Sequence, residues 1–326
     1  MSKGGYPNDR QYDRCMRLFR NINSLDYGSE LKKDINIENI SYKNDIKVVN
    51  FSLNSNKKSS NQEARIAIAS IGIDSEKDVI DVLKNPDCGL TIEKKLELYR
   101  MLNEAREQGA SMVVFPEYYL PVQWLPDIMY FCRKNKIIVV SGLRYICIKD
   151  NEKNCNTNAF NYVAIINPSI IDSRYVYAVP IIREKTYYAP EERKRLGELL
   201  FSCKNPEKVL HVINTGNYKY SDLMCYELTN IEYRYLLRGR IELLLIPENN
   251  KDTNYFSSIV DSASRDLHCF IIQVNTSQYG DSRITGPYKT LYKDIAKIKG
   301  GDNDLIIIGS AKYGEIIENA ICNISK

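Results

Sequence analysis

The sequence predicts an α/β protein in which two β-sheets pack face to face and helices cover their outer sides. From Ala64 onward, short runs rich in Ile and Val alternate with helical patterns. Some runs alternate apolar and polar residues, whereas others, such as "IELLLIP" at 241–247, are almost continuously apolar. Alternation indicates a strand with one exposed face, and a continuous run indicates burial on both faces. Together these patterns are typical of a sheet-on-sheet sandwich with helices outside it.

Length and composition fit one large core with a small appendage. The chain has 326 residues, of which 44% are hydrophobic and 26% are charged, as in an ordinary soluble protein. Its first residues, "MSKGGYPNDRQYDR", lack the apolar segment of a secretory signal. No apolar run approaches the roughly 18 residues of a membrane span. We therefore expect a cytoplasmic protein with no membrane contact.

Cysteine and histidine usage narrows the chemistry. The nine cysteines include no C-x-x-C pair, which argues against a disulfide framework and against a zinc cluster. The two histidines, His211 and His268, lie in or beside apolar strand-like runs, which favours structural roles. A histidine-rich metal site and a histidine general base are both disfavoured. We expect no metal and no cofactor.

Residues 1–62 differ from the rest and are predicted to form a basic, partly helical extension that ends in a linker. They carry eleven Lys and Arg against seven Asp and Glu. Apolar residues of the segment 9–24 fall on one face of a helix, with four arginines off that face. Such a helix could be a docking surface for an acidic or protein partner, or it could pack on the main domain. Residues 63–326 form the predicted main domain.

The elements of the main domain follow in order along the chain. A helix is predicted from Thr91, a suitable N-cap, to Gly109, and a second one over 254–268. The polar segment 147–160 is predicted to be a surface hairpin. The expected strands, each bounded by Gly, Pro, Asn or Asp, cover 64–71, 111–117, 136–145, 162–168, 175–182, 208–213, 222–228, 241–247, 269–276 and 305–311.

Three polar residues stand at or near the ends of these strands. Glu117 follows "SMVVFP", Lys185 follows "YAVPIIRE", and Cys225 lies in "SDLMCYELTN". Proteins of the α/β class build sites at strand ends and in the loops beyond them. Each residue alone is a weak signal, because a glutamate after a strand is more often a surface residue and a lone cysteine is more often a buried residue of the hydrophobic core.

The order and flanks of these residues resemble the nitrilase superfamily of carbon-nitrogen hydrolases over residues 64–315. Glu in "VVFPE", Lys in "REK" and Cys in "MCYEL" are followed by "IELLLIPEN" and by "SASRDLHCFIIQVNTSQYGDSRITGP". The resemblance implies a four-layer α-β-β-α sandwich of the nitrilase type, here with an N-terminal extension. It also implies a homo-oligomer, a dimer or larger.

The resemblance implies a catalytic triad. Cys225 would be the nucleophile, Glu117 the general base and later general acid, and Lys185 the group that stabilises the oxyanion. The chemistry is consistent, because an amide carbon is a poor electrophile that needs a thiolate beside it and stabilisation of the developing negative charge. The backbone N–H of Tyr226 would be a second oxyanion donor.

Further glutamates are candidates for supporting roles. Family members often carry a glutamate a few residues after the lysine, and here either Glu191 or Glu192 could fill that place. Both could instead be acidic residues at the start of a helix. Glu227 is either a pocket residue or a structural ion-pair partner. Tyr187 departs from the family pattern, which often has His at this position.

These residues support a hydrolase that cleaves a non-peptide C–N bond through a cysteine thioester. The substrate would be a small amide or, as a narrower version, a nitrile, although "CYE" lacks the Trp that commonly follows the cysteine of true nitrilases. An N-acyltransferase would use the same triad. The alternative from another class is a nitrilase-like domain that serves as a binding or assembly module of a larger system, as in some bacterial antiviral reverse transcriptases.

Overall fold

The computed structural model describes residues 35–53, 62–73, 76–85, 87–149, 157–171, 175–203, 206–301 and 304–314. The predicted helix within 9–24 and most of the predicted linker lie outside these ranges. None of the helices in the described ranges is long and apolar enough to cross a membrane.

Two large sheets form the centre of the molecule. The six-stranded sheet has the order β17-β3-β4-β5-β8-β9. Its strands are β3 (Ala64–Ser70), β4 (Met112–Val114), β5 (Ile138–Gly142), β8 (Tyr162–Ile171), β9 (Tyr175–Glu184) and β17 (Leu305–Ala311). β3, β4 and β5 run parallel, and the other neighbours are antiparallel.

The eight-stranded sheet has the order β1-β2-β11-β12-β13-β14-β15-β16. Its parallel centre consists of β12, β13 and β14, which follow one another in the sheet. The strands are β1 (Ile35–Lys43), β2 (Ile46–Leu53), β11 (Lys208–Asn214), β12 (Lys219–Asp222), β13 (Leu243–Pro247), β14 (Phe270–Val274), β15 (Ser282–Thr285) and β16 (Asp294–Ile298).

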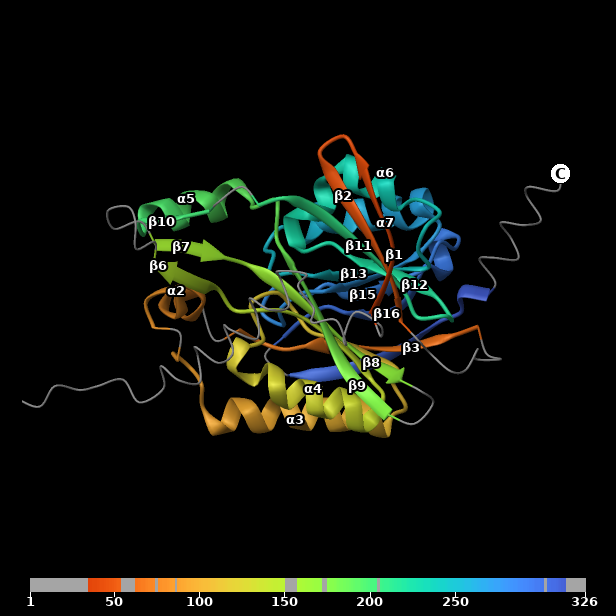
Figure 1. The fold of residues 1–326 in the computed structure, drawn as a ribbon, viewed down its shortest axis with the longest axis horizontal. Helices are drawn as coiled ribbons and strands as arrows, with labels where there is room; N and C mark the ends of the chain where they lie inside the picture. The colour runs from red at the N-terminus through yellow and green to blue at the C-terminus, as the bar shows by residue number, and fades with distance from the viewer. Residues whose placement is uncertain are drawn as a thin grey trace, which may run out of the picture.

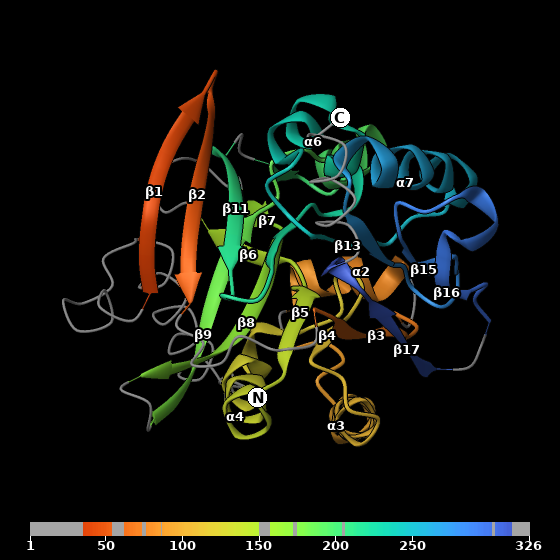
Figure 2. The same cartoon turned by 90° about the vertical axis from the view of Figure 1, so that its right-hand side faces the viewer.

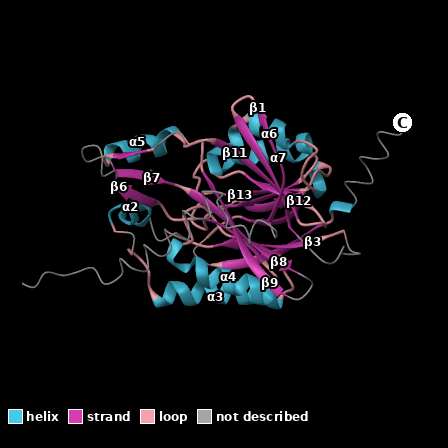
Figure 3. Ribbon diagram, viewed as in Figure 1, coloured by secondary structure: helices cyan, strands magenta, loops and turns pink. Residues whose placement is uncertain are grey.

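Helices cover both outer faces, so the molecule has four layers (Figures 1 and 3). α3 (Ile92–Glu107) and α4 (Leu125–Asn135) pack on the six-stranded sheet, and α6 (Ile231–Leu237) and α7 (Thr253–Leu267) pack on the eight-stranded sheet. A core of apolar side chains from both sheets, including Ile68, Val114 and Leu245, fills the space between them. The predicted α-β-β-α sandwich is therefore confirmed.

A smaller group of elements lies at one end of the sandwich (Figure 1). It contains α2 (Glu76–Lys84), α5 (Pro190–Glu198) and a three-stranded sheet of β6 (Ile146–Lys149), β7 (Thr157–Phe160) and β10 (Phe201–Ser202). β6 and β7 are antiparallel, as the predicted hairpin over 147–160 requires. Short 3-10 turns occur at η2 (Val122–Trp124), η3 (Cys225–Thr229) and η4 (Thr290–Tyr292).

A hairpin that was not predicted lies within the segment assigned to the extension. β1 and β2 pair antiparallel, and β2 runs parallel to β11 at the edge of the eight-stranded sheet (Figure 2). Ile46 and Val48 of β2 are fully buried against α-helical and strand residues of the main core. Both faces of β2 are packed, because Ile46 and Val48 join the core beneath α6 and α7, whereas Val49, Phe51 and Leu53 join the core between the two sheets. The proposed division of the chain at residue 62 stays a prediction, but this hairpin continues the main sheet.

Candidate active site

The three predicted catalytic residues come from both sheets at the end where the small group of elements lies. Glu117 follows β4 across Pro116, and Lys185 directly follows β9, both in the six-stranded sheet. Cys225 comes three residues after β12 of the eight-stranded sheet and begins the turn η3. Glu117 and Cys225 line one cavity of about 480 Å³.

Lys185 lies between two carboxyl groups. Its Nζ donates a hydrogen bond to Oε1 of Glu117 at 2.8 Å and to Oε2 of Glu192 at 2.7 Å. Both Glu117 and Lys185 are only 1% exposed. Of the two glutamates that the sequence left open, the structure brings Glu192 to the lysine, whereas Glu191 is an exposed residue at the cavity wall.

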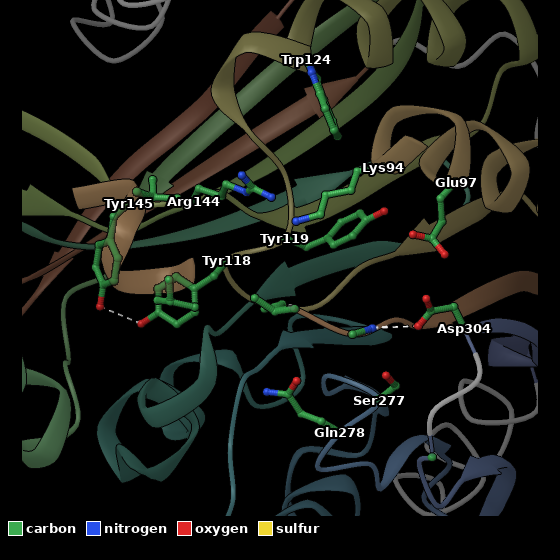
Figure 4. A pocket seen from close by; sticks show the side chains of 15 residues that line it. Lys94, Glu97, Tyr118, Tyr119, Trp124, Arg144, Tyr145, Ser277, Gln278 and Asp304 are labelled. Atoms are coloured by element: carbon green, nitrogen blue, oxygen red, sulfur yellow. Dashed lines mark hydrogen bonds between the residues drawn. The ribbon is translucent and has the colours of Figure 1, made fainter. Parts of the chain in front are cut away.

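Three further side chains hold these carboxylates in place. Asn161 Nδ2 donates to Oε1 of Glu117 at 2.7 Å. The Tyr145 hydroxyl donates to Glu192 at 2.6 Å, the Tyr118 hydroxyl also donates to Glu192, and the two hydroxyls lie 2.9 Å apart (Figure 4). None of these three side chains was predicted from the sequence.

The position of Glu117 depends on a glycine in the neighbouring strand. A Cβ atom on Gly142 would lie 2.5 Å from the Cα of Glu117 and 2.9 Å from the nitrogen of Tyr118. Real side chains do not approach backbone atoms this closely, so only glycine allows the loop after β4 to pass here. The Gly142 amide donates to Pro116 O at 3.1 Å and fixes the same loop.

Cys225 lies on a sharp turn. Its backbone has a φ of 47°, a left-handed conformation that is uncommon for residues other than glycine and is concentrated at functional sites. The residue is 8% exposed, and that surface faces the cavity. Tyr226, whose backbone N–H is the predicted second oxyanion donor, also lines the cavity.

Glu227 anchors this turn and does not line the cavity. Its fully buried carboxylate accepts hydrogen bonds from the Met224 amide at 2.8 Å and from the Thr186 amide at 2.7 Å. It also forms an ion pair with Arg183, which pairs with Asp222 as well. The network therefore connects the residues before Cys225 to the end of β9, which Lys185 follows. Glu227 is thus the structural ion-pair partner that was one of its two predicted roles.

The two glutamates beside Lys185 have opposite pKa shifts. Burial raises the pKa of Glu117, and this effect outweighs the opposing attraction of Lys185. Burial also acts to raise the pKa of Glu192, but Lys185 and the tyrosine hydroxyls outweigh it and lower the pKa overall. Paired acids with divergent pKa values have different chemical roles. Glu117 is suited to take up a proton, and Glu192 is suited to remain an anion.

The pKa values of the lysine and the cysteine complete this arrangement. Burial alone would lower the pKa of Lys185, but Glu117 and Glu192 raise it overall, so the ammonium form persists. Burial raises the pKa of Cys225, Glu117 raises it further, and Lys185 opposes both. The thiol therefore holds its proton, and Glu117 is the charged side chain that acts on it most strongly.

Neither histidine takes part in this site. His211 is buried against the ring of Phe51, and burial lowers its pKa to about 3. His268 follows α7 in a left-handed conformation as the C-cap of that helix. Among the described residues, no group of three or more His, Cys, Asp or Glu side chains is placed to hold a metal ion.

A second buried carboxyl group, missed from the sequence, lies beneath the site. The Glu248 backbone carbonyl accepts from the Glu117 amide at 3.4 Å, and its side chain accepts from Gln273 at 2.6 Å. Glu248 is fully buried, and burial raises its pKa to about 8. Its carboxyl group is therefore mostly protonated at neutral pH.

Comparison with known proteins identifies the fold. No protein-family model and no curated protein matches the sequence. The structure is similar to a mutant of the amidase from Nesterenkonia sp. AN1 that carries the acetamide moiety of fluoroacetamide on its active-site cysteine. This match has a TM-score of 0.52 and 15% identity and covers 83% of this chain and 98% of that chain.

Two other solved structures are similar to this chain. A CN-hydrolase superfamily protein from Xanthomonas campestris, with an arsenic adduct in its active site, matches with a TM-score of 0.54 and 11% identity over 79% of this chain and 94% of that chain. Glutamine-dependent NAD+ synthetase from Acinetobacter baumannii matches with a TM-score of 0.50 and 14% identity over 76% of this chain and 45% of that chain. The chain therefore has the nitrilase-superfamily fold that the sequence resemblance predicts.

Proposed function

We propose that the protein is a carbon-nitrogen hydrolase of the amidase type, in which Cys225, Glu117 and Lys185 are the catalytic residues. The observation that carries this proposal is the position of Lys185. Its ammonium group is held between Glu117 and Glu192, and its charge acts on the thiol of Cys225. A nucleophile, a base and a cation for a developing oxyanion thus act together beside one cavity.

The reaction would proceed through a thioester. Glu117 takes the thiol proton as the sulfur of Cys225 attacks the amide carbon, and Lys185 with the Tyr226 backbone N–H stabilises the oxyanion. The C–N bond then breaks, and the amine leaves with the proton from Glu117. Glu117 next accepts a proton from water, whose oxygen attacks the thioester and releases the acid. The cysteine thiol is restored when it recovers that proton.

The cavity has an apolar wall that includes Leu83, Leu196 and Phe256 and a polar wall, which together suit a small substrate with both kinds of group. Beyond the catalytic residues, its wall carries Asn249, Asn250, Lys251, Asp252 and Arg195. These side chains can hydrogen-bond to an amide or its acid product. A nitrile is the narrower alternative as substrate. If an amine instead of water accepted the acyl group, the same site would make the protein an N-acyltransferase. We also propose that the protein forms a homo-oligomer and that residues 1–62 bind a partner.

The test combines labelling with turnover. Fluoroacetamide has a poor leaving group, so its reaction with a cysteine depends on activation by the site. We expect intact-mass analysis to show one adduct that peptide mapping assigns to Cys225. Cys225→Ala should abolish the adduct. Cys203→Ala is the matched control, because Cys203 is half-buried and its pKa is raised to about 11, and it should leave the adduct unchanged.

Turnover is then measured as ammonia release from a panel of small amides. Glu117→Gln should lower the rate by about 10²- to 10⁴-fold because it removes the general base. A folded protein that forms no adduct at Cys225 and releases no ammonia would contradict the proposal. A partner that binds wild type and Cys225→Ala equally would then support the binding or assembly module.

A further inference from the structure

The catalytic cavity is larger than the simplest amides need. Its volume of about 480 Å³ lies in the range of pockets that enclose drug-sized ligands, roughly 300 to 1,000 Å³. A molecule as small as acetamide, bound at Cys225, would leave most of this space to water. The cavity therefore has room for a larger group of the substrate, and its lining indicates the chemistry of that group.

One wall of the cavity is apolar and comes from two helices of the small group at the end of the sandwich (Figure 1). Val79, Ile80 and Leu83 of α2 fall on one face of that helix, since residues three and four apart are neighbours on a helix surface. Leu196 of α5 and Leu199 at its C-cap are likewise three residues apart. The two helices thus present apolar side chains to the same space.

The protein itself covers this wall only in part. Leu83 and Leu196 belong to one buried cluster, and Val79 and Leu199 pack against it. Val79, Ile80 and Leu199 are only partly buried, although all three line the cavity. Apolar surface that faces water contributes binding free energy when a ligand covers it, roughly in proportion to the area covered. An apolar group of the substrate would therefore bind here.

The surroundings of Glu117 indicate which end of the amide faces this wall. In the proposed reaction the amine leaves with a proton from Glu117, so the amide nitrogen must approach that carboxylate. Glu117 is 1% exposed, and its Oε1 already accepts hydrogen bonds from Lys185 and Asn161. The space beside it suits an unsubstituted NH₂ group, which leaves as ammonia. The acyl group then extends away from Glu117, toward the apolar wall.

We propose that the substrate is a primary amide with an apolar acyl chain longer than acetyl, and that α2 and α5 bind this chain. The inference rests on the proposed amidase function and adds the class of acyl group to it. Phe256 of α7 lines the cavity as well, and its ring would cover the chain from that side. Each methylene that moves from water onto this wall should raise kcat/KM by about fourfold, until the chain fills the cavity.

The experiment compares kcat/KM of the full-length protein for acetamide, butanamide, hexanamide and N-butylacetamide. N-butylacetamide is an isomer of hexanamide that carries its chain on the nitrogen. Chromatography of the acid product follows all four amides in the same way. We expect kcat/KM to rise by at least about 30-fold from acetamide to hexanamide, and to be at least about tenfold lower for N-butylacetamide than for hexanamide. A flat series, or N-butylacetamide cleaved as well as hexanamide, would overturn the inference.

Variants assign the chain to this wall. Ile80→Gln and Leu199→Gln should each lower the ratio of kcat/KM for hexanamide to that for acetamide by about tenfold, because each puts a polar amide against the chain. Ile92→Gln is the matched control, because Ile92 is 73% exposed on α3 and does not line the cavity, and it should leave the ratio unchanged. Thermal unfolding checks that each variant is folded. An unchanged ratio in Ile80→Gln and Leu199→Gln, or an equal fall in Ile92→Gln, would refute the assignment.

Failure of this inference differs from failure of the amidase function. A fluoroacetamide adduct at Cys225 together with equal turnover of all four amides would reject the apolar acyl chain and leave the hydrolase in place. The absence of both adduct and turnover would reject the amidase function. Titration calorimetry on full-length Cys225→Ala, which lacks the nucleophile, tests the wall without turnover. Hexanamide should bind at least about tenfold more tightly than acetamide, and equal affinities would contradict the inference.

Discussion

At the scale of single residues, the adjacent Glu191 and Glu192 at the start of α5 lie in different environments. Glu192 accepts hydrogen bonds from Lys185 and two tyrosines, whereas Glu191 is exposed. Glu192→Gln should lower amide turnover by at least about tenfold, because Lys185 loses one of its two charged partners. Glu191→Gln should have less than about a twofold effect. Ammonia release by the two purified variants measures the difference, and equal losses would show that the helix start, not the lysine contact, matters.

Glu248 predicts a pH dependence of stability. Its pKa is about 8 in the folded protein and 4.5 for an ordinary glutamate, so between these pH values the folded state holds a proton that the unfolded state has released. Stability linked to Glu248 is therefore present at low pH and is lost as pH rises through about 8. A shift of this size corresponds to roughly 3 to 5 kcal/mol.

Glu248→Gln replaces the protonated acid with an amide of similar shape, and it should remove this dependence. We expect the free energy of unfolding in urea to fall less between pH 5 and pH 9 in Glu248→Gln than in wild type. Parallel pH profiles for the two proteins would mean that Glu248 does not hold a proton in the folded state.

The site residues that were predicted from the sequence have a local signal, whereas those that were not predicted are placed by contacts between distant parts of the chain. Glu117, Lys185 and Cys225 each stand at or near the end of an apolar strand, so local pattern and family resemblance both pointed to them. Asn161 and Tyr145 act through contacts with residues 44 and 47 positions away, which no local pattern records. The choice between Glu191 and Glu192 likewise depends on how α5 is oriented relative to Lys185, and the sequence does not show this orientation.

At the scale of elements, the turn η3 depends on a buried ion-pair network. Glu227→Gln should lower the free energy of unfolding by about 3 kcal/mol, because it leaves Arg183 only partly compensated in the core and weakens the amide contacts of Met224 and Thr186. Urea unfolding measures this change. Glu198→Gln is the control, because its pair with Lys194 is 65% exposed on the glutamate side, and it should change stability by less than about 0.5 kcal/mol. Similar losses in both variants would contradict the anchoring role.

The same turn shows why one predicted element was wrong. The segment 222–228 was predicted to be a strand from its apolar residues, but β12 ends at Asp222 and the chain turns at Cys225. Glu227 bonds to Arg183, which is distant in sequence, and this contact holds the turn in which Cys225 has a left-handed backbone. Such tertiary contacts outweigh the preference of the segment's apolar residues for a strand. The helix over 92–107 was predicted well because its N-cap Thr91 and its apolar spacing are local signals.

At the scale of the whole molecule, the layered architecture followed from periodicity, but the edge of the eight-stranded sheet did not. The continuous apolar strands β13 and β14 lie in its parallel centre, as their composition indicated. The β1–β2 hairpin was overlooked because polar residues interrupt its apolar ones and because it follows a basic segment. Its partner strand β11 lies more than 150 residues further along the chain, so no local pattern records this pairing.

The hairpin therefore provides a test of where the folded domain begins. Ile46 of β2 is fully buried beside Leu210 and Leu244, so Ile46→Ala would leave a cavity in the main core. We expect a loss of about 2 to 5 kcal/mol in the free energy of unfolding, in one cooperative urea transition. Ile40→Ala on β1 is the matched control, since Ile40 is 44% exposed, and it should cost less than about 0.5 kcal/mol. If the two variants were equally stable, residues 46–53 would be an appendage, and the domain would begin near residue 63 as the composition of the sequence suggested. A large loss for Ile46→Ala alone would extend the folded unit to include this hairpin, because only a side chain within the cooperative core destabilises the whole domain when it is truncated.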